Sequence, residues 1–220
     1  MTRRIFIDVD TQYDFCDPKG ALFVAGAPEA AKVCGRLVSQ AVREGALVLG
    51  SVDSHTHEAW EFNTNANVGP AGEKPGFPPH CVKGTWGWLK VPETLPARFA
   101  FVPVEPHEPS YPASAQAVYF EKEVYSLFAN PNAAKVLDRV AGDEAVEFVV
   151  FGVATDYCVR AAALGLREWA AGKGGAAANS TVTVVRDAVA GVAEESTARA
   201  WRELEAAGVQ VADSSRYLSA

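Results

Sequence analysis

The sequence predicts an α/β fold in which a doubly wound, mainly parallel sheet of six strands carries helices on both faces. Short apolar runs rich in β-branched residues recur along the 220 residues, and amphipathic helical patterns lie between them. Most of these runs lack polar alternation, which is typical of parallel strands covered on both faces. No internal repeat or low-complexity linker divides the sequence, so we expect a single domain over residues 1–220.

The expected strands follow the apolar runs at residues 5–9, 46–52, 117–120, 146–151, 181–185 and, more weakly, 209–211. Three apolar stripes with helical spacing mark helices between these strands. The stripes are Val33, Leu37 and Ala41; Val159, Ala162, Ala163 and Leu166; and Ala198, Trp201 and Leu204. Gly208 follows the last stripe and is a typical helix stop.

One stretch, residues 54–114, breaks this alternation. It holds most of the prolines and all four histidines, and it shows little periodicity. Long irregular segments within compact domains are usually functional loops. Its aromatic residues, which suit an ordered and packed loop, are Trp60, Phe62, Phe77, Trp86 and Trp88. We therefore expect metal-binding or substrate-binding residues in this stretch.

Composition excludes several classes of protein. Hydrophobic residues make up 49% and charged residues 21% of the chain, as in an ordinary globular protein. No run of about 18 apolar residues could span a membrane. The N-terminal MTRRIFIDVD lacks the long apolar region and cleavage site of a signal peptide, which favours the cytoplasm. The net charge of −7, without a basic block, argues against a nucleic-acid partner.

The cysteine spacing favours free thiols. None of the four forms a CxxC pair, so neither a zinc ribbon nor a thioredoxin-type motif is indicated. We expect all four to be reduced in the cytosol, and they are Cys16, Cys34, Cys81 and Cys158.

Cys158 differs from the other three in its position. It follows a predicted buried strand and Gly152, and it falls in the first turn of a helix for which Thr155 is a good N-cap. The positive end of a helix dipole lowers the pKa of a thiol, and backbone N–H groups there can hold an oxyanion. The alternative is a small buried hydrophobe, and position alone leaves both readings open.

A thiol nucleophile needs a proton acceptor, and charged residues follow two of the predicted strands. Asp10 ends the first strand and Lys122 follows the third, so both project towards the carboxyl edge, where a doubly wound sheet places its active site. A lone lysine at a strand end is otherwise most often on the surface. Asp14, in the same DTQYDF segment as Asp10, is expected to be solvated or to cap a turn.

A metal site is indicated separately. Asp53 and His55 lie at i and i+2 after the second strand, so an extended backbone points both side chains to one side. Carboxylate and imidazole ligands suit Zn, Mn or Fe. Further ligands must come from the long loop, where His57, Glu61 and His80 are available. Spacing alone also allows structural roles for these histidines.

The motifs VDTQYDF, VDSHTH, FPPHCVKGT, the strand-end Lys122 and FGVATDYCV follow one another in this order. Together they resemble the motifs of nicotinamidase/pyrazinamidase enzymes, which belong to the isochorismatase-like cysteine hydrolases. The resemblance covers nearly the whole chain and thins after about Asp187. It implies a three-layer, Rossmann-like fold and a homo-oligomer. It also implies a hydrolase of linear amide C–N bonds that converts nicotinamide to nicotinate and ammonia in NAD salvage.

The resemblance also assigns catalytic roles. It implies a catalytic triad of Asp10, Lys122 and Cys158. It further implies a cis peptide bond between Val153 and Ala154, and an oxyanion hole formed by the backbone N–H groups of Ala154 and Cys158.

The resemblance implies one divalent metal ion, Zn, Mn or Fe, held by Asp53, His55, Glu61 and His80. Glu61 stands where many members of the family have histidine, and His57 is the alternative ligand. Isochorismatase itself lacks this metal set, so Asp53, His55 and His80 together favour the nicotinamidase branch.

For the substrate pocket the resemblance implies Phe15 as a ring-stacking residue and Phe77 in place of a frequent tryptophan. Leu22 and Tyr125 are further candidates. The alternative for the two phenylalanines is that they are core aromatics.

The expected mechanism begins when Asp10 takes the proton of Cys158 and the thiolate attacks the carboxamide carbon. Protonated Asp10 then helps ammonia to leave, and water hydrolyses the thioester. The metal ion is expected to orient the substrate through its pyridine nitrogen. Three alternatives stay open. They are a related cysteine hydrolase acting on another small amide or carbamoyl compound, metal-centred hydrolysis without a covalent intermediate, and a non-catalytic binding module on the same fold.

Overall fold

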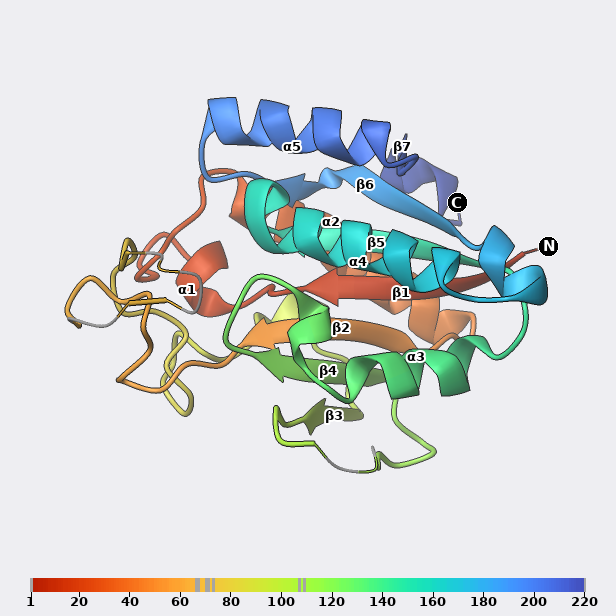
Figure 1. The fold of residues 1–220 in the computed structure, drawn as a ribbon, viewed down its shortest axis with the longest axis horizontal. Coiled ribbons are helices and arrows are strands. Elements are labelled where there is room, and N and C mark those ends of the chain that lie inside the picture. The colour runs from red at the N-terminus through yellow and green to blue at the C-terminus, as the bar shows by residue number, and fades with distance from the viewer. Residues whose placement is uncertain are drawn as a thin grey trace.

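The computed structural model describes residues 2–65, 68–69, 72, 74–106, 108 and 110–219. Within these residues, seven parallel strands form one sheet in the order β3-β4-β2-β1-β5-β6-β7 (Figure 1). The strands are β1 (Arg3–Val9), β2 (Val48–Asp53), β3 (Phe99–Val102), β4 (Ala117–Lys122), β5 (Val146–Val153), β6 (Thr181–Ala190) and β7 (Gln210–Ala212). The predicted doubly wound parallel fold is thereby confirmed.

The sheet has one strand more than the six that the sequence predicts. All six predicted runs are strands, and the additional one is β3, a four-residue edge strand within residues 54–114. It pairs in parallel with β4. Its short length and the nearby Pro96 and Pro103 conceal it from a search for longer apolar runs.

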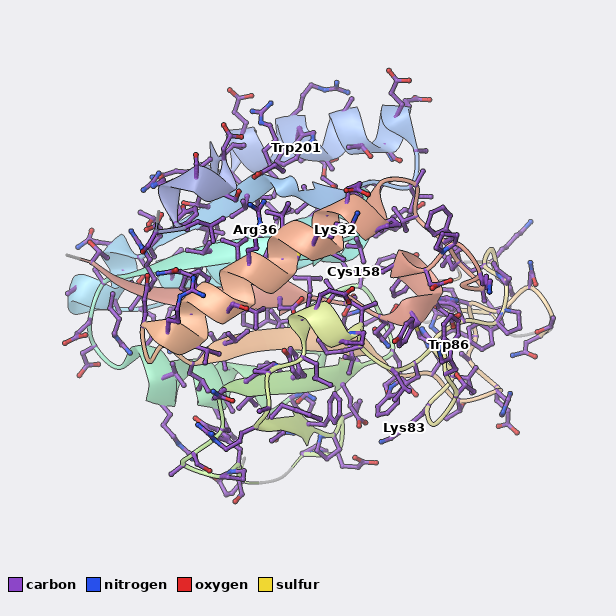
Figure 2. All side chains as sticks on the ribbon, turned by 180° about the vertical axis from the view of Figure 1, so that it is seen from behind. Lys32, Arg36, Lys83, Trp86, Cys158 and Trp201 are labelled. Carbon is purple, nitrogen blue, oxygen red and sulfur yellow. The ribbon has the colours of Figure 1, made fainter. Side chains whose placement is uncertain are left out.

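Helices cover both faces of the sheet. Helix α2 (Ala27–Arg43) packs on one face and lies in front in Figure 2. Helices α3 (Ala133–Ala141), α4 (Arg160–Ala171) and α5 (Glu194–Ala206) contribute to the core on the other face. The four-residue α1 (Tyr13–Cys16) follows β1. Short 3₁₀ helices span Pro92–Thr94, Leu127–Ala129, Gly175–Asn179 and Ser214–Arg216, and a π-helical turn spans Thr155–Val159.

The predicted helical stripes are mostly buried, with Val33, Ala198 and the partly buried Trp201 as exceptions. Val33 is only partly buried, whereas its neighbour Cys34 faces the core. Ala198 is exposed, because the face of α5 that meets the rest of the protein runs through Ala200 and Leu204, four residues apart. Among the described residues, no helix is long and apolar enough to cross a membrane.

The carboxyl ends of four neighbouring strands, β4, β2, β1 and β5, meet at one edge of the sheet, from which the loops between β2 and β3 project (Figure 1). The register places Asp53 directly opposite Lys122, and Val9 opposite both Ser51 and Gly152. Gly152 has a φ of +120°, and a Cβ atom there would lie 2.0 Å from the carbonyl oxygen of Val9. Only glycine therefore allows β1 and β5 to approach this closely at the edge.

Candidate active site

Lys122 is the centre of a buried charged cluster at the carboxyl edge. Its Nζ forms an ion pair with Oδ2 of Asp10 at 2.8 Å and contacts Oδ1 of Asp53. The same Nζ lies 3.5 Å from Sγ of Cys158. The three residues proposed from the sequence as a triad thus come together from β4, the end of β1 and the start of the helix after β5. Figure 2 shows Cys158 in the interior, towards the loops that carry Lys83 and Trp86.

Burial controls the electrostatics of this cluster. It raises the pKa of Asp10 and that of the Cys158 thiol, and the Lys122 ammonium opposes the shift in both. Burial alone would lower the pKa of Lys122, but Asp10 and Asp53 hold it well above its ordinary value. The pKa of Cys158 therefore shifts opposite to the lowering expected from a helix start, because burial outweighs Lys122. The thiol needs a nearby base to become a nucleophile.

The turn that carries Cys158 differs from the predicted one. Ala154, in extended conformation, takes the N-cap position expected for Thr155. The helix opens with a π turn, in which the N–H of Val159 donates to the carbonyl of Ala154 at 3.1 Å. The helix therefore starts one residue earlier than the sequence predicts. The peptide bond between Val153 and Ala154 is cis, as expected.

Four potential metal ligands lie beside Lys122. Oδ2 of Asp53 is 3.8 Å from Nε2 of His55 and 3.8 Å from Nε2 of His80. Oε1 of Glu61 is 3.0 Å and 3.4 Å from the same two nitrogens. All four residues are buried, whereas His57 is exposed. Of the two candidates for the remaining ligand, Glu61 is therefore the one that lies with the other three.

The donor atoms of this cluster fit a divalent cation. Both ring nitrogens of His55 are buried; Nδ1 has no hydrogen-bond partner among the described residues, and Nε2 faces the carboxylates of Asp53 and Glu61. Nδ1 of His80 lies 2.9 Å from the carbonyl of Pro78, which can only accept, so the lone pair of a neutral ring is on Nε2. Although burial opposes it, Asp53 and Glu61 raise the pKa of His55 to about 9. Two imidazoles and two carboxylates suit Zn, Mn or Fe.

An apolar pocket opens beside Cys158 and the metal cluster. Its lining includes all four predicted substrate residues, which are Phe15, Leu22, Phe77 and Tyr125, together with Ala154. The ring of Tyr157 lies 5.2 Å from that of Tyr125 and 5.9 Å from that of Phe77, between centroids. The pocket therefore presents apolar and aromatic side chains next to the thiol.

Comparison with known proteins places the chain in a family. The model of the isochorismatase domain matches residues 103–216. The nicotinamidase/pyrazinamidase of Mycobacterium tuberculosis is 30% identical over 219 residues, which cover 96% of this chain and 100% of that protein. The chain belongs to the isochorismatase family. The nicotinamidase of Escherichia coli is 27% identical over 217 residues, which cover 94% of this chain and 93% of that protein.

The solved structures agree with this membership. The pyrazinamidase of Pyrococcus horikoshii in complex with zinc is 27% identical, with a TM-score of 0.70 over 96% of this chain and 99% of that one. The resemblance predicted from the motifs is thereby confirmed. The predicted enzyme class, a hydrolase of linear amide bonds, agrees with both curated relatives, which are amidases by name.

Two residues of this isochorismatase-family site were not predicted from the sequence. The side-chain amide of Gln12 donates to the carbonyl of Asp53 and accepts from its N–H, both at 2.8 Å. Oγ of Ser51 donates to Oδ1 of Asp10 at 2.7 Å. Gln12 lies within the DTQYDF motif, so its place beside Asp10 was a signal that could have found it.

Asp14 is not solvated, and of the two roles expected for it the structure agrees with capping, because its carboxylate binds backbone N–H groups. It is buried, and its carboxylate accepts from the N–H of Ala21 at 2.9 Å and from that of Cys81 at 2.7 Å. It therefore ties the segment after α1 to the loop that follows His80. Val24, Tyr157 and Val192, which also line the pocket, were not predicted either.

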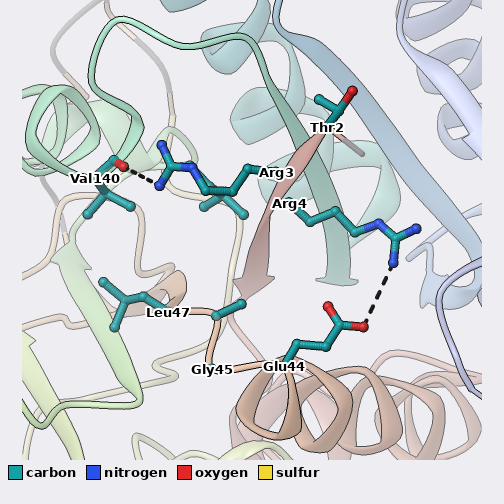
Figure 3. Close-up of a pocket in the computed structure, with 9 residues that line it drawn as sticks. Thr2, Arg3, Arg4, Glu44, Gly45, Leu47 and Val140 are labelled. Carbon is teal, nitrogen blue, oxygen red and sulfur yellow. Dashed lines mark hydrogen bonds and ion pairs between the residues drawn. The ribbon is translucent and has the colours of Figure 1, made fainter.

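A more open cleft, of about 520 Å³, lies at the opposite end of the sheet near the start of β1 (Figure 3). Its charged groups are engaged in structural contacts. Arg3 donates to the carbonyls of Val140 at 2.7 Å and Ala141 at 2.6 Å, at the end of α3. Arg4 pairs with Glu44 at 3.8 Å. Neither a cysteine nor a histidine is among its lining residues, in contrast to the candidate site at the carboxyl edge.

Proposed function

We propose that this protein hydrolyses nicotinamide to nicotinate and ammonia through a thioester on Cys158. The observation that carries the proposal is the position of Lys122, whose ammonium contacts Asp10, Asp53 and Cys158 together. This position joins a nucleophile and a base to a potential metal cluster beside one aromatic pocket. The curated relatives named nicotinamidase support the choice of substrate.

In the first step Asp10 takes the proton of Cys158. Burial raises the pKa of the thiol, so it needs a base, and burial also raises the pKa of Asp10, which makes its carboxylate a better acceptor. The thiolate then attacks the carboxamide carbon. The backbone N–H groups of Ala154 and Cys158 hold the oxyanion, and each such donor is worth a factor of about 10²–10³ in rate.

The second step breaks the C–N bond, and Asp10 returns the proton to the departing nitrogen, so that ammonia leaves. Lys122 is an ammonium in the resting site, because Asp10 and Asp53 hold its pKa well above the ordinary value. Its charge keeps the carboxylate of Asp10 and the sulfur of Cys158 next to each other. Water, deprotonated by Asp10, then hydrolyses the thioester and releases nicotinate and the free thiol.

The pocket positions the ring of the substrate. Apolar and aromatic contacts to the ring come from four lining residues, which are Phe15, Leu22, Phe77 and Tyr125. Asp53, His55, Glu61 and His80 would hold one divalent ion. When bound, this ion supplies Lewis acidity and an attachment point for the ring nitrogen. The zinc complex of the P. horikoshii relative makes zinc the first metal to test.

The test is ammonia release by the purified protein from nicotinamide, pyrazinamide, an aliphatic amide and a carbamoyl compound, with metal analysis of the same sample. We expect turnover of the two aromatic amides and about one divalent ion per chain. Turnover restricted to the aliphatic amide or the carbamoyl compound would assign the protein to another branch of the family.

A further inference from the structure

A second ion pair is fully buried behind the loop that carries Asp10. Nζ of Lys90 lies 3.0 Å from Oδ2 of Asp8, and both side chains have no exposed surface. Asp8 lies on β1, two residues before Asp10, and Lys90 comes from the segment between β2 and β3. The ring of Tyr119 covers the ammonium, 4.3 Å from Nζ to its centroid. The proposed chemistry uses neither member of the pair.

Both charged groups converge on the hydroxyl of Thr11. This hydroxyl donates to Oδ1 of Asp8 at 2.8 Å and accepts from Nζ of Lys90 at 2.7 Å. A third contact, with Oγ1 of Thr94 at 2.7 Å, uses its remaining lone pair. Since a hydroxyl has one donor and two acceptor positions, its capacity is filled. The carbonyl of Thr11 also accepts from the N–H of Val91 at 2.9 Å.

Thr11 directly follows Asp10, whose backbone conformation is unfavourable unless neighbouring groups hold it in place. Asp10 has a φ of +48°, in the left-handed region that residues with a Cβ seldom adopt. Such a conformation persists only where the surroundings fix it from several sides. Ser51 holds one side of Asp10, since its carbonyl accepts from the Asp10 N–H at 3.1 Å and its hydroxyl bonds the carboxylate. On the C-terminal side, Asp10 is joined to Thr11, which its own hydrogen bonds hold in place.

A buried ion pair is a weak means of adding stability, because an apolar pair of similar size often serves as well. Its geometric effect on Thr11 is therefore the more specific consequence of placing it here. We propose that Asp8 and Lys90 are positioning residues, which fix Thr11 and thereby aim the Asp10 carboxylate at Lys122 and Cys158. The inference rests on the proposed function for the role of Asp10 as the base, and it adds two residues to that account.

The first test removes the hydroxyl alone. Thr11→Val keeps the shape of the side chain, and we expect kcat for nicotinamide to fall at least about ten-fold with KM changed less than about two-fold, since a displaced base affects reaction more than binding. Thr11→Ser, which retains the hydroxyl, should restore kcat to within about three-fold of the wild type. Thr183→Val is the matched control, because its hydroxyl bonds another buried carboxylate, Glu147, at 3.1 Å at the other end of the sheet. It should leave kcat unchanged.

The second test removes both charges at once. The double variant Asp8→Leu/Lys90→Met leaves no unpaired ion, and it should fold and lose kcat to the same extent as Thr11→Val. It decides the question alone if Thr11→Val does not fold. Each variant is first shown to be folded by circular dichroism at the assay temperature. A folded double variant that keeps the wild-type kcat overturns the inference.

A separate readout distinguishes this inference from the proposed function. Iodoacetamide alkylates Cys158 at a rate that depends on the base beside it, whatever the substrate, and mass spectrometry of the peptide measures that rate. We expect slower alkylation in Thr11→Val and in the double variant, and the wild-type rate in Thr183→Val. If the wild type releases no ammonia from nicotinamide, the proposed function fails. The alkylation rates then decide the positioning role, and equal rates in all variants overturn it.

Discussion

The two ends of the sheet both bury carboxylates, but they use them differently. At the amino end, Oε1 of Glu147 accepts from the hydroxyls of Tyr217 at 2.8 Å and Thr183 at 3.1 Å, and so fixes the end of the chain to the sheet. At the carboxyl end, the ammonium of Lys122 contacts the carboxylates of Asp10 and Asp53 and the sulfur of Cys158. Nε2 of His55 there faces two carboxylates, and its Nδ1 has no hydrogen-bond partner within the described residues.

The state of the buried polar atoms, rather than the size of the cleft, distinguishes the end that carries the proposed active site. The amino end has a cleft of about 520 Å³, but Arg3 and Arg4 beside it are engaged in structural contacts. The pocket beside Cys158 is narrower, yet the proposed nucleophile, the proposed base and four potential metal ligands converge on it. Variants at the two ends should therefore separate activity from stability.

The largest expected effect is that of Cys158→Ala. It should lower ammonia release from nicotinamide by at least about 10⁴-fold, because the proposed covalent route is lost. Cys34→Ala is the matched control, since Cys34 is equally buried but lies on α2, where it bonds the carbonyl of Ala188. It should keep kcat. Comparable rates in the two variants would remove Cys158 from its proposed role.

The next effect is that of Lys122→Met, which should lower both activity and stability. The buried carboxylates of Asp10 and Asp53 would lose their shared cation, at a cost of about 3–5 kcal/mol in the free energy of unfolding. We expect kcat to fall about 10³-fold or more. Urea unfolding and steady-state kinetics measure the two effects.

The matched change at the amino end is Arg216→Met. Arg216 pairs with Glu147 at 3.0 Å, but its side chain is 49% exposed, so the loss should be below about 1 kcal/mol, with unchanged kcat. Equal losses of stability in Lys122→Met and Arg216→Met would contradict the difference between the two ends.

A smaller effect is expected in Glu61→Gln, which tests the proposed ligand that stands where many members of the family have histidine. The weaker amide donor should reduce the affinity for the metal by about 10–100-fold, measured as the metal retained during dialysis against a chelator. His57→Ala should keep its metal, because His57 is exposed. Loss of metal in His57→Ala with retention in Glu61→Gln would reverse the assignment of the ligand.

Tyr217→Phe, also at the amino end, should change stability more than activity. It removes the hydrogen bond to Glu147 and should lower the free energy of unfolding by about 1–3 kcal/mol, seen as a lower Tm. The value of kcat should stay within about two-fold of the wild type. A larger change in kcat would show that the two ends of the sheet are coupled.

Much of the architecture could be predicted because its signals are local. The apolar runs gave six strands, and Asp10, Asp53 and Lys122 each stand at a strand end. The contact between these residues depends on the order of the strands in the sheet, however. No local pattern predicts that β4 pairs with β2 and thereby brings Lys122 opposite Asp53. Edge strand β3 is too short to show in the pattern.

The remaining differences arise from tertiary structure. The pKa of Cys158 is raised, whereas its place at a helix start predicts a lowered one, because burial, which the sequence does not reveal, outweighs the Lys122 cation. Ser51 and Tyr157 reach the site only through strand register and the geometry of the π turn. The choice between Glu61 and His57 as the metal ligand likewise depends on the path of the loop, because the loop buries Glu61 and exposes His57.

The most direct test of the account is to trap the intermediate on Cys158. Protein mixed with nicotinamide and quenched within one turnover is digested, and its peptides are analysed by mass spectrometry, with hydroxylamine added to a parallel sample to capture acyl groups. The account predicts a nicotinoyl adduct on the peptide that contains Cys158, and nicotinoyl hydroxamate in the parallel sample. Full-rate ammonia release with neither product would contradict covalent catalysis by this cysteine.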